Sequence, residues 1–382
     1  MSTEQGNMSN TSMRTKFGQT VIVAVFLCVV LAVASARGET EAEVSPEQRA
    51  RSQFGSGVKF LQEKKFLSAA ESFERAVQAM PNFFEAHLNG GIALVQLGRE
   101  TRDVPLQLQR FQLAAEKFSR AAELNPKEKM TYLLWSETLV WVGDLPLDAS
   151  ARLGCYMGAA EKCRLAAELA PDDWEIYNKW GVILTTKLVD FAPDSATRVK
   201  LCEEAAGYFA KAAERARFSS EKGAVYANWG GTLTDMARHS PTLSVKRARL
   251  QAATEKFEQS VKVIASVPAT YALWGVTLLE LGKVNHSRTD YRAAIEKFRT
   301  SLEIRPDDPA VLYSLACAYA LSENSVLAVR TLKECFAVDR TGTYIGQAHG
   351  AEDLKSLRGN REFEDLFGDG GRQPAAPVRS LK

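Results

Sequence analysis

Side chains that commonly carry out catalysis or bind metals are few in this sequence and lie far apart. Its histidines form no HExxH pair, and no two of them stand at the short spacing that paired metal ligands need. We therefore expect neither a metal site nor a bound cofactor. The four histidines are His87, His239, His286 and His349.

The cysteines form no recognisable redox or zinc framework. Cys28 lies in an apolar N-terminal run, and the remaining five include no CxxC or CxxCH pair. Because a free cysteine packs like a small apolar side chain, we expect these five to be buried thiols. They are Cys155, Cys163, Cys202, Cys317 and Cys335.

Glycine patterns indicate no nucleotide site. The sequence contains neither GxxxxGK[ST] nor GxGxxG, and it lacks the GxSxG of many hydrolases. The paired glycines Gly90-Gly91 and Gly230-Gly231 are expected instead at close contacts between helices. The sequence therefore predicts that this protein is not an enzyme.

The charges of the chain nearly balance. Lys and Arg number 48 against 46 Asp and Glu, for a formal net charge of +2. So small a net charge gives no overall field to attract nucleic acid, and any partner must be recognised locally. With 382 residues and 46% hydrophobic content, the chain can build a large core, either as two domains or as one long repeat array.

Residues 1–36 have the layout of a targeting segment. Arg14 and Lys16 precede an unbroken apolar run at 21–34, and the small residues up to Ala36 fit a cleavage site. Two interpretations remain open: a signal peptide cleaved after Ala36, or an uncleaved transmembrane anchor at 17–36, which has about the length that spans a bilayer. In both, the positive charges favour a cytoplasmic N-terminus.

An aromatic frame recurs four times and indicates an internal repeat. In each copy a tryptophan follows a tyrosine by three residues, immediately precedes a glycine or serine, and is followed by a leucine four residues later. Equivalent placement in successive units favours helix packing over a ligand cage for these rings. The tryptophans are Trp135, Trp180, Trp229 and Trp274.

A second periodic block accompanies each frame. Alanine, an aromatic residue and another alanine recur at spacings of four and three, which place them on one helical face. Prolines follow several blocks, where a residue without an N–H ends a helix. Examples of the blocks are Ala69/Phe73/Ala76, Ala114/Phe118/Ala121 and Ala205/Phe209/Ala212, and the prolines are Pro81, Pro126, Pro171 and Pro306.

Together these motifs resemble the tetratricopeptide repeat family, whose unit is a helix pair of about 34 residues. The resemblance covers 46–339 and implies an all-α, right-handed α-solenoid of about seven repeats with a C-terminal capping helix. We expect an acidic linker at 37–45, a capping segment at 340–368 and a disordered tail at 369–382. The small first-helix positions are Gly57, Gly91, Ser136, Gly181, Gly230, Gly275 and Ala316.

Five units exceed the usual repeat length. The spacing from Gly57 to Gly91 is 34 residues, whereas that from Gly91 to Ser136 is 45. The additions lie between the first helix and the periodic part of the second, and they read as an N-terminal extension of the second helix. Because insertions at one point of a solenoid map to one edge, we expect a raised rim that contributes specificity. The added segments are 99–110, 144–155, 189–201, 238–249 and 283–290.

The family resemblance also implies a groove lined by first-helix side chains close to the small position. Asparagines there carry a donor and an acceptor that can pair with an extended peptide backbone. The basic stretch 246–249 is expected to be solvated helix surface. The candidate partner-binding residues are Asn89, Leu133, Leu134, Asn178, Lys179, Asn228, Leu273, Tyr313 and Ser314.

These features predict a non-catalytic scaffold or adaptor for a protein or peptide partner, either anchored in a membrane or exported to a periplasm or lumen. A second interpretation is an organelle outer-membrane receptor whose array faces the cytosol. A third is an RNA-binding helical repeat, which the near-neutral charge disfavours.

Overall fold

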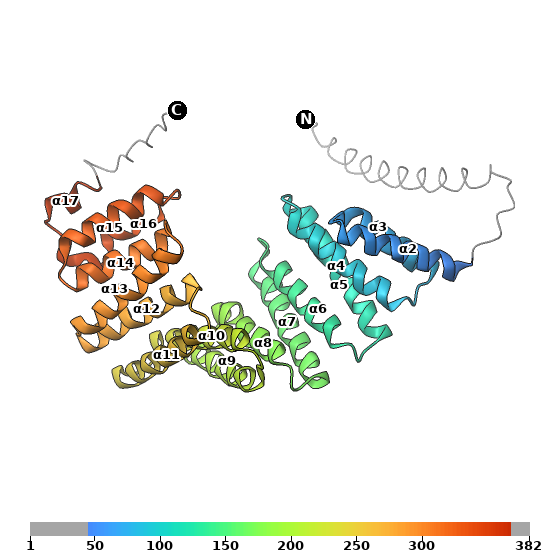
Figure 1. Cartoon of the computed structure of the whole chain (residues 1–382), viewed down its shortest axis with the longest axis horizontal. Coiled ribbons are helices and arrows are strands. Elements are labelled where there is room, and N and C mark those ends of the chain that lie inside the picture. The colour runs from blue at the N-terminus through green and yellow to red at the C-terminus, as the bar shows by residue number, and fades with distance from the viewer. Residues whose placement is uncertain (1–44, 368–382) are drawn as a thin grey trace, which may run out of the picture.

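A computed structural model describes residues 45–367, which form an all-α solenoid of seven helix pairs and a short C-terminal segment (Figure 1). This arrangement confirms the fold class expected from the repeats. The first helices of the pairs are α2 (Pro46–Gln62), α4 (Phe84–Glu100), α6 (Lys129–Gly143), α8 (Trp174–Thr186), α10 (Ser219–Arg238), α12 (Pro268–Asn285) and α14 (Pro309–Leu321). The second helices are α3 (Phe66–Ala79), α5 (Val104–Leu124), α7 (Ala149–Leu169), α9 (Ser195–Arg215), α11 (Leu243–Val263), α13 (Arg288–Ile304) and α15 (Ser325–Val338).

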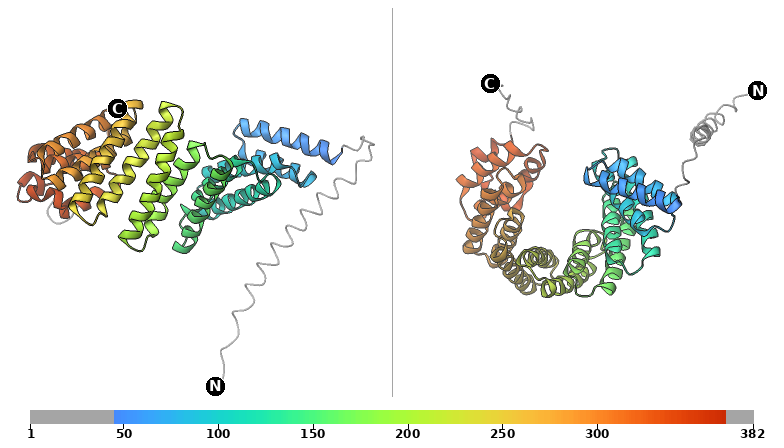
Figure 2. Two further views of the ribbon diagram at one scale, coloured as in Figure 1. Left: turned by 90° about the horizontal axis from the view of Figure 1, so that it is seen from below. Right: turned by 45° about the vertical axis from the view of Figure 1, so that its right-hand side comes forward.

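The helix pairs stack into an open arc, with the first and last pairs at its two ends (Figure 2). Successive first helices touch one another, as α2 touches α4, α8 touches α10, and α12 touches α14. Since the inner layer of an arc is the more crowded, these contacts place the first helices on the inner face and the second helices on the outer face. The groove predicted on the first helices therefore corresponds to the inner face.

A contact between a glycine and an aromatic ring recurs along the solenoid. A Cβ atom added to Gly91 would lie 2.7 Å from the ring of Phe118, and one added to Gly275 would lie 2.6 Å from Phe298. No larger residue fits at that approach without displacing the ring. Glycine therefore lets the two helices of a pair meet closely enough to bury the ring. The rings of Phe73, Phe118, Phe209, Phe257 and Phe298 are at most 1% exposed.

Two pairs achieve the same contact with different residues. In the third pair Cys163 replaces the ring, and the small residue is Ser136, whose hydroxyl donates to the carbonyl oxygen of Ala159 at 2.8 Å. In the seventh pair Leu332 stands in the ring position and Ala316 in the small position, and both are fully buried. In both pairs the second helix has a smaller side chain than phenylalanine and the first helix has a larger residue than glycine. The two changes compensate, so the space between the helices stays filled.

The second helices of the lengthened units begin earlier, as predicted. Helices α5, α7, α9 and α11 are each 21 residues long, against 14 for α3 and α15. The added turns repeat the glycine-to-ring contact: an added Cβ on Gly98 would lie 2.5 Å from Phe111, and one on Gly143 would lie 2.5 Å from Tyr156. The extension is therefore part of the packed core and not a loop.

Side-chain caps explain where the extended helices start. A carboxylate oxygen of Asp103 accepts a hydrogen bond from the backbone N–H of Leu106 at 2.9 Å, and Asp148 accepts one from Ala151 at 2.9 Å. Each such cap stabilises its helix by about 1 kcal/mol. At the other end, α3, α5, α7 and α13 each finish two residues before one of the four predicted prolines.

The C-terminal segment covers the last helix pair. It consists of α16 (Thr343–Gly350), the 3₁₀ helix η2 (Glu352–Leu357) and the single turn α17 (Arg361–Glu364). Leu354, Leu357 and Phe363 are at most 2% exposed and belong to the core cluster of α14 and α15. The capping segment is thus not the single capping helix that was expected, because Gly359 adopts the left-handed region, with φ at 82°, between η2 and α17.

Among residues 45–367, no helix combines the length and apolar character needed to cross a bilayer. The targeting segment predicted at 1–36, the linker predicted at 37–45 apart from Ser45, and the tail predicted at 369–382 lie outside the described residues.

The close approach at the glycines gives a direct test of this packing. Gly275→Ala should lower the free energy of unfolding by about 1–3 kcal/mol, because the added methyl group overlaps Phe298. Gly207→Ala, in the middle of α9 with nothing within 4 Å of the added Cβ, should raise it by about 0.4–1 kcal/mol. Urea unfolding followed by circular dichroism compares the two. A shift of the same sign for both variants would contradict the proposed packing.

Candidate partner-binding surface

The predicted groove residues form a row across the inner face. Six of them hold one position, two residues before the small residue, in successive first helices. The row therefore crosses the repeats and does not run along one helix. It comprises Asn89 of α4, Leu134 of α6, Lys179 of α8, Asn228 of α10, Leu273 of α12 and Ser314 of α14.

Two asparagine side chains from neighbouring repeats form a hydrogen bond with each other. The amide nitrogen of Asn228 donates to the amide oxygen of Asn178 at 3.0 Å, and both side chains are half-buried. This bond fixes their orientation across the joint between α8 and α10. It uses one acceptor and one donor, so the pair retains a donor on Asn178 and an acceptor on Asn228 for a ligand.

Other members of the row differ in how available they are. Leu273 is 46% exposed, which is a large fraction for an apolar side chain next to polar neighbours. The ammonium of Lys179 lies 3.4 Å from a carboxylate oxygen of Glu137 and 3.5 Å from one of Glu175. Lys179 is thus held between two carboxylates, and exposed pairs of this kind contribute little to stability.

Leu133 is a correction to the predicted groove. It is 3% exposed and packs in the core with Ile176, because the position three residues before the small residue faces the next repeat in this pair. It cannot contact a partner in the folded protein. Tyr313 holds the same position in α14, and the centre of its ring lies 5.2 Å from the centre of the Tyr344 ring in α16. Burial raises the pKa of the Tyr313 hydroxyl.

Two further row members use their polar groups within their own helices. The side-chain nitrogen of Asn89 donates to the carbonyl oxygen of Glu85 at 2.8 Å, and the hydroxyl of Ser314 donates to that of Ala310 at 2.9 Å. The centre of the row, from α6 to α12, therefore offers the more available surface.

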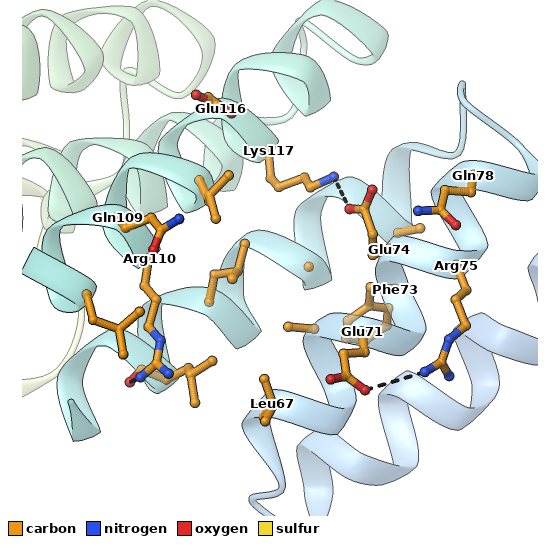
Figure 3. A pocket seen from close by; sticks show the side chains of 17 residues that line it. Leu67, Glu71, Phe73, Glu74, Arg75, Gln78, Gln109, Arg110, Glu116 and Lys117 are labelled. Carbon is orange, nitrogen blue, oxygen red and sulfur yellow. Dashed lines mark hydrogen bonds and ion pairs between the residues drawn. The ribbon is translucent and has the colours of Figure 1, made fainter. Parts of the chain in front are cut away.

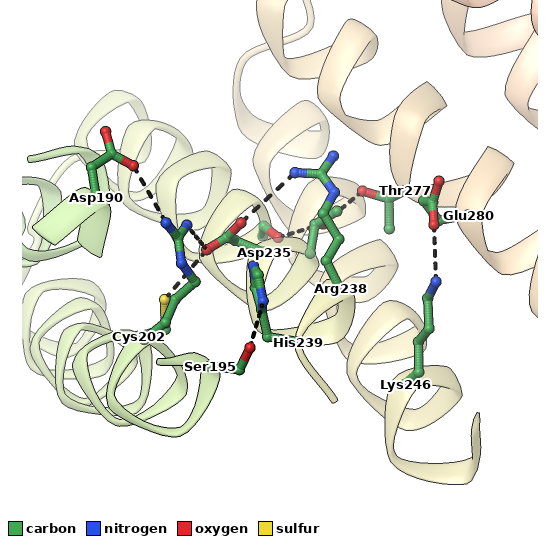
Figure 4. Close-up of polar contacts among 12 residues, drawn as sticks. Asp190, Ser195, Cys202, Asp235, Arg238, His239, Lys246, Thr277 and Glu280 are labelled. Atoms are coloured by element: carbon green, nitrogen blue, oxygen red, sulfur yellow. Dashed lines mark hydrogen bonds and ion pairs between the residues drawn. The ribbon is translucent and has the colours of Figure 1, made fainter. Parts of the chain in front are cut away.

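The predicted rim carries a hollow between the fourth and fifth pairs. It has a volume of about 660 Å³ and is lined by Ser195, Val199, Arg238 and His239 among others. Beside it, the guanidinium of Arg198 lies 3.6 Å from a carboxylate oxygen of Asp190 and 3.6 Å from one of Asp235 (Figure 4). The pair with Asp235 joins the start of α9 to α10, and the pair with Asp190 joins α9 to the preceding 3₁₀ helix η1 (Leu188–Phe191), so ion pairs link three elements of the rim.

The basic stretch 246–249 is not simply solvated surface as expected. The ammonium of Lys246 lies 3.0 Å from a carboxylate oxygen of Glu280 in the next repeat (Figure 4). Arg249 donates to the carbonyl oxygen of Met236 at 3.1 Å and also pairs with Glu203 of the preceding repeat at 3.2 Å. These cations link neighbouring repeats and satisfy a carbonyl at the end of a first helix.

The recurrent tryptophans pack between helices, as predicted, and lie under cations that the sequence analysis did not recognise. The ammonium groups of Lys162, Lys256 and Lys297 lie 3.8, 4.0 and 3.9 Å from the ring centres of Trp135, Trp229 and Trp274. At the fourth site, the ring of Tyr208 stacks on Trp180 at 4.1 Å. In these three units a lysine directly precedes the core residue of the second helix, and this recurrence is the sequence pattern that could have predicted the contact between cation and ring.

No protein-family model matches the sequence, and no curated protein matches it. Among solved structures, a tetratricopeptide repeat protein from Parabacteroides merdae has a TM-score of 0.51 at 12% identity, covering 81% of this chain and 98% of that protein. PilF of Pseudomonas aeruginosa has a TM-score of 0.46 at 15% identity, covering 70% and 96%. YrrB, described as a TPR protein with an unusual peptide-binding site, has a TM-score of 0.41 at 18% identity, covering 62% and 100%. At these identities the likeness shows the fold alone.

The five cysteines of the described residues should differ in reactivity. Burial raises the pKa of Cys163 to about 11 and that of Cys202 to about 12, and Cys317 and Cys335 are likewise buried. Since the thiolate is the nucleophile, iodoacetamide at pH 8 should modify partly exposed Cys155 before these four. Peptide mass spectrometry with and without urea measures each site, and rapid modification of Cys202 in the folded protein would contradict the burial.

The same shifts set the sign of a pH effect. The unfolded thiols ionise near their ordinary value of 9.0, whereas the buried thiols stay protonated. The unfolded state therefore binds fewer protons above pH 9, and these groups make the folded state less stable as the pH rises.

Proposed function

We propose that this chain, which has the tetratricopeptide-repeat fold, is a non-catalytic scaffold that binds another protein on the inner face of its solenoid. The observation that carries the proposal is the row of equivalent side chains across successive first helices. Its centre has polar groups in the middle and an apolar group on each side, with Leu134 and Leu273 flanking Lys179 and Asn228. Such mixed surfaces are typical of sites that bind protein segments.

An extended segment of the partner fits this row. The Asn178 and Asn228 pair offers a donor and an acceptor that match the C=O and N–H groups of a peptide backbone. Exposed Leu273 of α12 and half-buried Leu134 of α6, at the two ends of this central part, provide apolar contact for side chains of the segment. Recognition would then combine backbone pairing at the centre with apolar contact on both sides.

We further propose that residues 1–36 place the array at a membrane or beyond it. The basic residues, apolar run and small-residue site in the sequence support this targeting. A receptor on an organelle outer membrane with a cytosolic array is the alternative. Protease treatment of intact organelles separates the two, because a cytosolic array is digested without detergent.

Photo-crosslinking tests the inner face. A benzophenone amino acid in place of Leu273 should crosslink to one discrete partner, whereas the same group in place of Met157, 58% exposed on α7, should not. Asn178→Ala with Asn228→Ala should reduce the crosslinked product about five-fold or more, as expected for the loss of about 1 kcal/mol per hydrogen bond. Equal crosslinking from the two positions would refute the inner-face proposal. A salt-sensitive RNA as the major product would favour the RNA-binding interpretation.

Fractionation and intact-mass measurement test the targeting proposal. The chain should be recovered either in the membrane fraction at full length or as a mature form that begins at Arg37. The first result identifies an anchor and the second a cleaved signal peptide. A full-length chain in the soluble cytosolic fraction would disprove membrane targeting and leave the inner-face proposal untouched.

A further inference from the structure

The position directly before the small residue of the first helix carries a large apolar side chain in most repeats and none in the second. The residue directly before the small residue of the first helix is a tryptophan in the third to sixth units and Leu315 in the seventh. In the second unit that residue is Gly90. Six of the seven repeats follow another repeat. Among these six, only the second has no side chain at the position before the small residue.

The tryptophans show what this position normally does. Trp180 packs against Ala159 and Cys163 of the preceding repeat's α7, and Trp274 is only 6% exposed within the cluster that includes Phe257 of α11. Trp180 therefore lies between α7 and α9, and Trp274 between α11 and α13, in each case above the first helix that carries the ring. The ring also joins one repeat to the next.

In the second unit the same space is open. A hollow of about 800 Å³ lies between α3 and α5 (Figure 3), and Gly90 of α4 is one of the residues that line it. A Cβ added to Gly90 would lie 3.4 Å from the Cβ of Phe73, so the backbone leaves room for a side chain. The edges of the hollow carry exposed apolar side chains, namely Leu67 at 55%, Leu106 at 38% and Leu113 at 39%.

The cation that covers the ring elsewhere is still present. Lys117 holds the position in α5 that Lys162, Lys256 and Lys297 hold in their helices, directly before the core residue. Without a ring beneath it, its ammonium pairs across the hollow with Glu74 of α3 (Figure 3). The hollow therefore combines an apolar slot with a cation placed to lie over the negative face of an aromatic ring.

We propose that this hollow binds an aromatic side chain, an indole in particular, presented by a protein partner. The ring would occupy the place of the missing tryptophan, with Lys117 over its face and Phe73 and Leu94 beneath it. The six tryptophans of this sequence all lie within 45–367, at positions 135, 141, 174, 180, 229 and 274, so the ring comes from another molecule. The hollow is on the outer face, which makes this site separate from the inner row of the proposed function.

The inference is tested with N-acetyl-5-fluorotryptophanamide and the full-length protein, by fluorine NMR. The signal should broaden and shift in a saturable way with wild-type protein. Gly90→Trp fills the hollow from within and should weaken binding at least ten-fold, while its melting temperature stays equal or rises. Gly154→Trp, which adds a ring at a position of α7 with nothing within 4 Å of the Cβ, should bind like the wild type.

Further variants separate the apolar slot from the cation. Lys117→Met should weaken binding of the indole about three- to ten-fold but leave the weaker binding of N-acetylleucinamide unchanged, since the loss concerns the cation alone. Ala70→Phe closes the hollow from α3 and replaces Gly90→Trp if that variant unfolds.

Equal binding to wild type and to a folded, filled variant would overturn the inference. Absence of saturable indole binding to the wild type would also overturn it. Inner-face variants such as Asn228→Ala should leave indole binding unchanged, so failure here is distinguishable from failure of the proposed function.

Discussion

The closest approach between the two helices of each pair is the constraint on which the solenoid depends. A glycine such as Gly181 lets the ring of Phe209 touch the backbone of the first helix, and an added Cβ would lie 2.8 Å from that ring. Because the ring is then buried on both sides, the pair behaves as one rigid unit. The next repeat packs against that unit, so the geometry of each joint follows from the contact within the pair.

The lengthened repeats extend this constraint and do not interrupt it. Two added helical turns place Phe111 over Gly98 and Tyr156 over Gly143, seven residues from the first contact. The carbonyl groups at the ends of the first helices are then satisfied by long side chains of the extended second helices. For example, the guanidinium of Arg152 donates to the carbonyl oxygen of Gly143 at 3.1 Å. The rim is thus an ordered extension of the core.

Much of this fold could be predicted from the sequence, because small and aromatic residues at helical spacing report the face that must be buried. The seven small positions, the extended second helices and the helix-ending prolines all follow from such local patterns. The C-terminal segment was less predictable, since its break depends on the conformation of Gly359. The candidate groove was predicted by position alone, and position does not reveal that Leu133 is buried or that Asn178 bonds to Asn228. The hollow at Gly90 could be recognised only when an absent side chain was compared with its equivalents in space.

The missing ring at Gly90 also bears on how stability is distributed along the array. In a solenoid each repeat contacts only its immediate neighbours. The cooperativity of unfolding therefore depends on the interface at each joint between repeats. The joint between the first and second pairs lacks the indole that strengthens the joints of the third to sixth. The first pair is therefore held to the second by the direct packing of α3 against α4, without an indole between the two second helices. The joints of one array thus reach their cohesion by two routes, direct helix packing at the first and an interposed indole at those of the third to sixth pairs.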